Sequence, residues 1–294
     1  MRSYYLPCLA LLAIGAGPPP KTTTPTEVVA NSPASAWRAI DPDDLMVMDL
    51  KNGGRVVIQL APQFAPVHVA NIRALARSDF WNGAAIYRVH DNFVAQWGNN
   101  ETEKPWPAGV IAAPPAEYTR PLKGLNVKPL GYADQFAPGA GYALGWPIAY
   151  SVKGNWANLA HCYGAVGAGR GDDTGTGGEL YAVIGHAPRA LDRNIAVVGR
   201  VIEGIERLSG LPRGTEALGV YKDRAQDVPI AGIRLASMMP EGERPAFQYM
   251  DERSPAFAAY LKSKANRKDS FYIRSAGGVD LCGATVPVRR KPAP

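Results

Sequence analysis

Two runs of apolar positions separated by a turn open the regular part of the chain. Residues 45–50 (LMVMDL) and 55–60 (RVVIQL) are rich in the side chains that strands favour. Asn52-Gly53-Gly54 between them is a turn sequence. The pattern therefore predicts a hairpin, and Pro62 ends its second strand.

The spacing of apolar residues becomes helical directly after this hairpin. Pro66 suits the first turn of a helix, where its missing N–H costs nothing. Val67, Ile72 and Leu75, together with two alanines, form an apolar stripe that continues to Arg77. These residues predict an amphipathic helix that packs by one face.

Residues 80–98 (FWNGAAIYRVHDNFVAQWG) form the stretch around which the rest of the chain is organised. Their β-branched and aromatic side chains predict one strand over 86–90 and a second over 93–97. Asp91-Asn92 between them is a turn, since both side chains bond to nearby backbone and tolerate left-handed geometry. The segment therefore predicts a second hairpin.

Side chains alternate between the two faces of a strand, and this brings polar groups of the second hairpin together. Arg88 and His90 share one face of its first strand, and Val94 and Gln96 share one face of its second. With Phe93 at the turn, a guanidinium, an amide and apolar side chains converge. This combination suits a surface that holds a peptide.

The segment 100–158 interrupts this order. It contains eight prolines and no sustained period, and we expect an elaborated surface loop without its own regular structure. Loops of this length are uncommon and often functional. Strand-like patterns return from Leu159, and a closing strand is expected over 229–236.

Both ends of the chain depart from the pattern of its centre. Residues 1–17 have the form of a secretory signal, with an apolar run too short to span a bilayer. Residues 18–38 are mostly Pro, Thr, Ser and Ala and predict a disordered linker. We therefore expect one folded domain over 39–236, followed by a small α+β extension over 237–294.

Within the extension, Ser254-Pro255 is a helix start, and the helix is expected to continue to Lys264. Short strands are expected over 271–274 and 279–288.

Composition narrows the class of fold and of partner. The 294 residues include 31 Gly and 26 Pro, which indicates many turns and a mainly β fold. The net charge of +6 comes from scattered Lys and Arg, which is typical of a solvated surface, so no nucleic acid partner is expected. We expect a monomer that is not inserted in a membrane once the signal is removed.

Several motifs, in order along the chain, carry a family resemblance. Tyr87-Arg88-Val89 with Phe93 to Gly98 resembles the F-H-R-V-x-x-x-F-x-x-Q-G-G signature of cyclophilin-type peptidyl-prolyl isomerases. Residues 164–170, 178–183 and 191–204 are similar to later motifs of the same family. The resemblance implies an eight-stranded antiparallel β-barrel capped by two helices.

The resemblance also implies an activity and a set of roles. A prolyl isomerase acts on proline-containing polypeptides and needs neither a cofactor nor a metal. Arg88, Gln96 and Phe93 match the catalytic positions of the family. The matched substrate-binding positions are Val94, Gly169, Arg170, Glu179, Tyr181, Leu191 and Ile195.

Three positions depart from the family pattern at the rim of the implied site. Glu179 replaces a glutamine, Ile195 replaces a histidine, and Ala190 replaces the tryptophan of cyclosporin-sensitive members. We therefore expect altered substrate preference and weak cyclosporin binding. A second function stays open: a non-catalytic peptide-binding chaperone or scaffold on the same barrel.

Whether the cysteines form a disulfide depends on the compartment in which the protein resides. Removal of the signal would remove Cys8 and leave Cys162 and Cys282 as a pair in a periplasmic or secreted protein. A bridge between them would attach the extension to the barrel and would place their Cα atoms about 4.4–6.8 Å apart. The alternative is two separately buried thiols.

Overall fold

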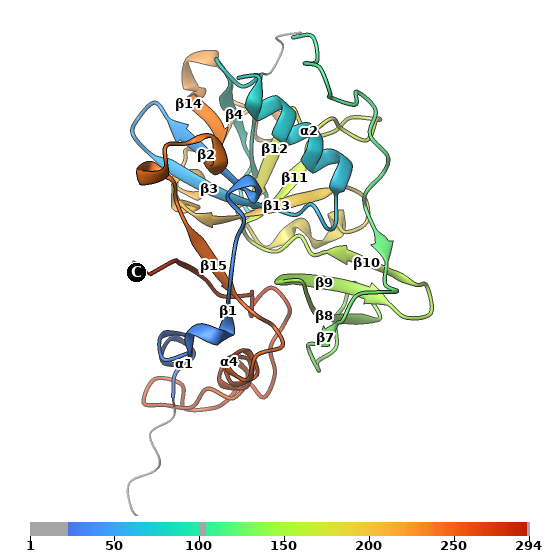
Figure 1. Ribbon diagram of the computed structural model, residues 1–294, viewed down its shortest axis with the longest axis vertical. Helices are drawn as coiled ribbons and strands as arrows, with labels where there is room; N and C mark the ends of the chain where they lie inside the picture. Colours follow the sequence, from blue (N-terminus) through green and yellow to red (C-terminus); the bar gives the residue numbers. More distant parts are fainter. Residues whose placement is uncertain (1–22, 100–103, 293–294) are drawn as a thin grey trace, which may run out of the picture.

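Eight antiparallel strands close into a barrel in the order β11-β12-β5-β4-β14-β2-β3-β13. The computed structural model describes residues 23–99 and 104–292. The barrel fills the upper part of Figure 1 and confirms the predicted mainly β fold class. Its strands are β2 (Leu45–Leu50), β3 (Arg55–Leu60), β4 (Ala85–Val89), β5 (Val94–Gly98), β11 (Ala165–Ala168), β12 (Leu180–Val183), β13 (Val197–Glu203) and β14 (Val228–Leu235).

Two helices pack into the core of the barrel. The helix α2 (Pro66–Arg77) buries an apolar stripe that includes Ile72 and Leu75. The single-turn helix α3 (Glu206–Ser209) buries Leu208 in the same core. The barrel is therefore capped by two helices as predicted, although the second has only four residues.

The segment predicted as a loop over 100–158 carries a second sheet in its described part, which is a correction to the prediction. Figure 1 shows this sheet below the barrel, and its strand order is β6-β10-β9-β8-β7. The strands are β6 (Arg120–Pro121), β7 (Lys128–Pro129), β8 (Gly139–Ala143), β9 (Trp146–Ser151) and β10 (Trp156–Leu159).

Proline content concealed these strands from sequence reasoning. Pro121 and Pro129 lie in the two edge strands of the inserted sheet, where a missing N–H interrupts no inner ladder. Leu144 and Gly145, with φ of 57° and 80°, form a two-residue turn between β8 and β9. Glu117, just before the sheet, accepts hydrogen bonds from backbone N–H groups in the first turn of α2.

The predicted disordered linker over 18–38 is wrong for its described residues. The helix α1 (Pro25–Ala30) begins with a capping box formed by Thr24 and Glu27, and it packs against α4 (Pro255–Ala265). The strand β1 (Trp37–Ala39) pairs with β15 (Phe247–Met250). These contacts are distant in sequence, so local composition did not indicate them. Residues 1–17, the predicted signal, lie outside the described residues, as do 18–22.

The extension has its predicted helix but different strands. The strands are β15, which was not predicted, and β16 (Val288–Arg290). In this described segment no strand forms over 271–274, and only Val288 of the expected strand over 279–288 lies in one. Instead, the side chains of Asp269 and Asp280 accept hydrogen bonds from backbone N–H groups two or three residues on, which favours turns over a ladder.

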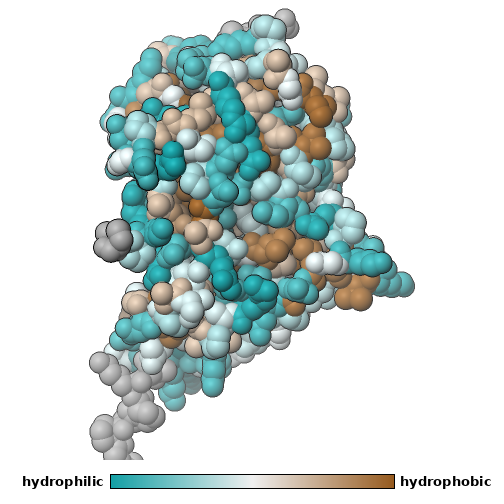
Figure 2. Space-filling view, viewed as in Figure 1, coloured by the Kyte–Doolittle hydropathy of each residue, from teal (hydrophilic) through white to brown (hydrophobic). Residues whose placement is uncertain are grey.

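The inserted sheet and the extension both cover outer faces of the barrel. On β2, Met46 and Met48 face the barrel interior, whereas Leu45 and Val47 pack with Phe247 of β15. Figure 2 shows hydrophobic side chains gathered at mid-height of the molecule, at the level of β9. Burial on both faces explains the unbroken apolar runs Leu45–Met48 in β2 and Val56–Ile58 in β3.

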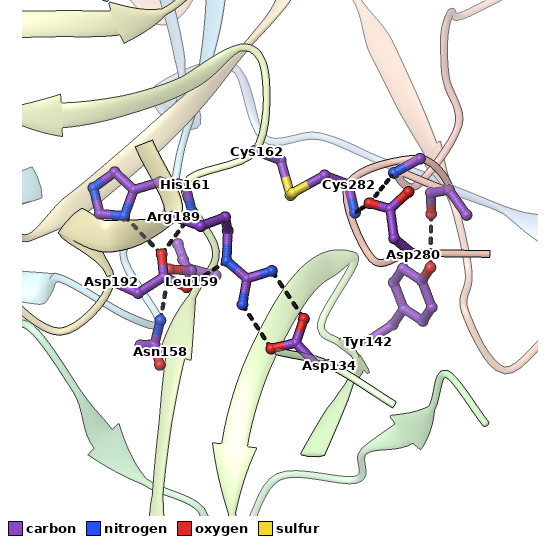
Figure 3. Close-up of a disulfide and its surroundings, with 12 residues drawn as sticks. Asp134, Tyr142, Asn158, Leu159, His161, Cys162, Arg189, Asp192, Asp280 and Cys282 are labelled. Carbon is purple, nitrogen blue, oxygen red and sulfur yellow. Dashed lines mark hydrogen bonds and ion pairs between the residues drawn. A yellow bond between two sulfur atoms is a disulfide. The ribbon is translucent and has the colours of Figure 1, made fainter. Parts of the chain in front are cut away.

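The predicted disulfide between Cys162 and Cys282 is present, with Cα atoms 5.0 Å apart. It connects the segment before β11 to the extension, and Figure 3 shows its surroundings. The bridge belongs to a buried cluster that also contains Trp37, Tyr142 and Phe257. The N-terminal segment, the inserted sheet and the extension thus share one core beside the barrel.

Candidate active site

The pairing of the strands places three predicted site residues and one neighbouring glycine in a row on the outer face of the barrel. Arg88 in β4 pairs with Gln96 in β5, Gln96 pairs with Tyr181 in β12, and Tyr181 pairs with Gly167 in β11. Directly paired residues of antiparallel strands present their side chains on the same face. A Cβ at position 167 would lie 2.3 Å from the Tyr181 ring, so only glycine leaves room for this ring.

A β-bulge adds Tyr87 to this row. The register shifts between Ile86 and Arg88, while Ile86 and Val89 are both buried in the barrel core. Tyr87 and Arg88 therefore both face outward. Strict alternation predicted the orientation of Arg88 but missed Tyr87; the three-residue spacing of Ile86 and Val89 is the sequence signal that could have found it.

A chain of hydrogen bonds connects these residues. Arg88 Nη1 donates to Gln96 Oε1 at 2.7 Å, and Gln96 Nε2 donates to the Tyr87 hydroxyl at 2.5 Å. The Tyr87 hydroxyl donates to Glu179 Oε2 at 2.8 Å. Burial and the Glu179 carboxylate raise the pKa of Tyr87, so its hydroxyl keeps the proton that it donates. The chain fixes the Gln96 amide with its oxygen toward Arg88.

Arg88 has a second anchor on the opposite side. Its Nε donates to the backbone oxygen of Leu218 at 2.7 Å, in a segment that bridges to β4 at Val220. Burial lowers the pKa of Arg88, but a guanidinium remains charged at neutral pH. Within residues 23–99 and 104–292, Nη2 makes no hydrogen bond and is available to a ligand. Sequence reasoning missed Leu218 because a backbone oxygen carries no residue signature.

The predicted apolar residues lie in one hydrophobic cluster. Val94 and Tyr181 are buried, and Phe93, Leu191 and Ile195 are half-buried against them. The Phe93 ring also lies 5.9 Å from the Arg88 guanidinium carbon. The inserted sheet supplies the remaining side of this cluster, including Trp146, Ile148 and Leu159. The inserted sheet, which was predicted to be a loop, therefore packs against the apolar part of the site.

Gly169 and Arg170 have different positions relative to the row. A Cβ on Gly169 would lie 3.4 Å from Gln96 Nε2, so the backbone at Gly169 borders the glutamine. The Arg170 guanidinium instead donates to the backbone oxygen of Asn194 at 3.0 Å and lies 5.6 Å from the Tyr118 ring. The structure brings Gly169 to the row and directs the Arg170 side chain elsewhere.

A buried polar network contacts the hydroxyl group of Tyr181 and fixes the position of its ring. Its hydroxyl lies 3.0 Å from His161 Nε2, and His161 Nδ1 lies 2.9 Å from Asp192. Arg189 binds both Asp192 and Asp134, as Figure 3 shows. Burial tends to raise the pKa of Asp192, but the His161 hydrogen bonds and the Arg189 charge lower it. Sequence reasoning did not connect His161 to Tyr181.

The described residues contain no group of three His, Cys, Asp or Glu side chains arranged to hold a metal ion. Among the helices of this part of the chain, none is long and apolar enough to cross a membrane.

The fold and the site define one class of protein, a closed antiparallel β-barrel that carries an outward-facing arginine beside an apolar cluster. The family model for cyclophilin type peptidyl-prolyl cis-trans isomerase/CLD matches residues 45–237, and the chain belongs to this family. It is a peptidyl-prolyl cis-trans isomerase.

Similar proteins agree with this assignment. A probable peptidyl-prolyl cis-trans isomerase of Brucella suis biovar 1 is 25% identical over 179 residues, which are 61% of this chain and 76% of the relative. A homologue from Brucella abortus strain 2308 is 24% identical over the same shares. The crystal structure of cyclophilin AquaCyp293 from Hirschia baltica matches with a TM-score of 0.69 and 25% identity, over 90% of this chain and 96% of that chain. This structural match extends beyond residues 45–237.

Proposed function

We propose that Arg88 accelerates rotation of Xaa-Pro bonds in polypeptide substrates and that the Gln96, Phe93 and Tyr181 side chains hold the substrate around it. The observation that carries this proposal is the guanidinium of Arg88, fixed by Gln96 and Leu218 with Nη2 left available. Phe93, Leu191 and Ile195 form the adjoining half-buried apolar surface, and the buried Tyr181 ring lies beneath it.

The physics of the reaction requires little more than such a donor. Resonance across the peptide bond creates a rotational barrier of ~18–20 kcal/mol. In the twisted state the resonance is lost and the proline nitrogen regains a lone pair. A donor that is already in place stabilises the twisted state more than either planar state, which is the condition for catalysis.

The apolar cluster supplies the grip on the substrate. A proline ring placed against Phe93 and Leu191 would bury apolar area, while the Gln96 amide and the backbone at Gly169 border the polypeptide backbone. Fixing the ring while the preceding residue rotates lets Arg88 act on one bond. No step of this mechanism requires a metal or cofactor.

A protease-coupled isomerisation assay on Xaa-Pro peptides tests the proposal. Arg88→Ala should lower kcat/KM by about two to three powers of ten, the scale of losing one preorganised donor. Arg207→Ala, at an exposed position on α3, is the matched control and should retain activity. Full activity of Arg88→Ala would place catalysis elsewhere, and an inactive wild type would favour a non-catalytic peptide-binding chaperone.

We further propose that the protein works in the cell envelope, in the periplasm or after secretion. The Cys162–Cys282 bridge supports an oxidising compartment, and the pattern of residues 1–17 supports export. Cell fractionation and the mass of the mature chain test this. A cytosolic protein that retains residues 1–17 would contradict it.

A further inference from the structure

We propose a second binding site, for a small amphiphilic anion, in the hollow where the extension meets the barrel. The hollow has a volume of about 630 Å³, within the range of small-molecule sites. Its walls come from α1, β9, β13, α4 and residues 285–288. It does not include Arg88, Gln96 or Phe93, so the inference goes beyond the proposed function and does not depend on it.

The charge of the lining is one-sided. Arg200, Lys264 and Arg267 line the hollow, and no Asp or Glu is among the lining residues. Arg267 is already paired with Asp269 at 2.8 Å. In the part of the chain that the structure describes, neither Arg200 nor Lys264 forms an ion pair with a carboxylate. Two positive charges are therefore left for a ligand.

Arg200 is the central group of this site. It lies in β13, and its Nε and Nη2 donate to Gln59 Oε1 at 3.0 and 2.8 Å. The face of Trp146 lies 4.5 Å from its guanidinium carbon. Both neighbours are neutral. Burial lowers the pKa of Arg200 to about 10, so it stays charged at neutral pH. Arg200 is half-buried, and a partly desolvated cation with only neutral partners is stabilised when an anion joins it.

The remaining walls are apolar, and they indicate that the ligand also has an apolar part. Leu159, Val197 and Val286 face the hollow together with the rings of Trp146 and Tyr260. A simple anion would leave these apolar walls exposed to water, whereas an apolar group attached to an anionic head would bury them. A carboxylate, sulfonate or phosphate head with a hydrocarbon or aromatic body therefore fits both parts of the lining.

The hollow is also held in shape before a ligand arrives. Cys162 lines it, and the disulfide joins Cys162 to Cys282, which lies just before the wall segment 285–288. The hydroxyl of Tyr260 donates to the backbone oxygen of Thr285, which connects α4 to residues 285–288. A preformed cavity loses little ordering free energy on binding.

Fluorescence titration of the full chain with 1-anilinonaphthalene-8-sulfonate tests the inference, because this probe combines an aromatic body with an anionic head. We expect saturable binding of one equivalent. Arg200→Gln should weaken it about tenfold or more, the scale of one charge-assisted hydrogen bond. N-phenyl-1-naphthylamine, which lacks the sulfonate, should bind wild type and variant equally weakly. Unchanged probe affinity in a folded Arg200→Gln protein, or equal affinity of the two probes for the wild type, would overturn the inference.

Two further variants complete the design. Arg193→Gln is the matched control, since Arg193 also lies over a tryptophan ring, 4.6 Å from Trp156, but outside the hollow; its probe affinity should be unchanged. If Arg200→Gln does not fold, the exposed Lys264→Gln decides: a several-fold loss supports the site, and unchanged affinity overturns it.

Competition identifies the ligand chemistry. Decanoate should displace the sulfonate probe, and sodium sulfate at the same concentration should not. If sodium sulfate by itself displaces the probe, the hollow is a simple anion site and the amphiphile assignment is overturned.

Discussion

Arg88 is held by neutral oxygen atoms rather than by a carboxylate. The Gln96 amide oxygen and the Leu218 backbone oxygen accept its hydrogen bonds, and Glu179 is reached only through Tyr87. A directly paired carboxylate would offset the positive charge and compete with the substrate nitrogen for the guanidinium. In the proposed mechanism, neutral anchors fix the geometry of Arg88 and keep its full charge for the twisted amide.

Gln96→Ala should lower kcat/KM by about one to two powers of ten in the peptide assay, less than Arg88→Ala. The change removes one charge-assisted hydrogen bond at 2.7 Å and the link to Tyr87, but it leaves the Leu218 anchor in place. Gln63→Ala, at an exposed glutamine, is the matched control. A Gln96→Ala enzyme with wild-type kcat/KM would show that this anchor is dispensable.

At the scale of single residues, sequence reasoning found the groups that belong to a motif. Arg88, Gln96 and Phe93 lie in one hairpin and meet as predicted. Tyr87 was missed because a bulge reverses its orientation, and His161 because its link to Tyr181 crosses 20 positions of sequence. Such contacts depend on the tertiary structure and leave no local pattern.

At the scale of elements, segments whose partners are adjacent in sequence were predicted, and segments whose partners are distant were missed. The hairpin of β2 and β3 and the helix α4 follow from adjacent residues, and both form as expected. The strand β1 was missed because its partner β15 lies more than 200 positions away, as the pair Trp37 and Met250 shows. Strand formation there depends on a distant partner rather than on local propensity.

Reduction of the Cys162–Cys282 bridge should lower the free energy of unfolding by at most about 4–5 kcal/mol. The two cysteines are 120 positions apart, and closing a loop of this length restricts the unfolded chain strongly. Urea unfolding with and without dithiothreitol measures the effect. A variant with both cysteines replaced by serine should match the reduced protein and should not respond to dithiothreitol. An unchanged urea midpoint after reduction would contradict the stabilising role.

At the scale of the whole molecule, the N-terminal segment and the extension close around each other beside the barrel. Arg38 of β1 donates to Asp251, which follows β15, at 2.8 Å, and Arg253 donates to the same carboxylate at 3.1 Å. Burial alone would raise the pKa of Asp251, but these hydrogen bonds lower it to about 2. An ionised carboxylate therefore joins the strand β1 to the extension.

This arrangement predicts a pH dependence of stability. The folded-state pKa of Asp251 lies below the unfolded value of about 3.9, so its contribution is fully present above about pH 4 and is lost as the pH falls toward 2. Urea unfolding should show wild type more stable than Asp251→Asn at pH 5, with the difference narrowing between about pH 4 and pH 2. Asp172→Asn, at an exposed loop position, is the control. A difference that stays constant over this range would contradict the assignment.

The central claim is that an anchored guanidinium, rather than a positive charge alone, drives isomerisation. Arg88→Lys retains the charge but cannot reach Gln96, Leu218 and the substrate together. The most direct measurement is the cis–trans exchange rate of an Ala-Pro peptide by NMR exchange spectroscopy, with wild type and Arg88→Lys at equal concentration. We predict that the lysine variant shows about one hundredth or less of the wild-type acceleration. Acceleration equal to that of the wild type would contradict the account.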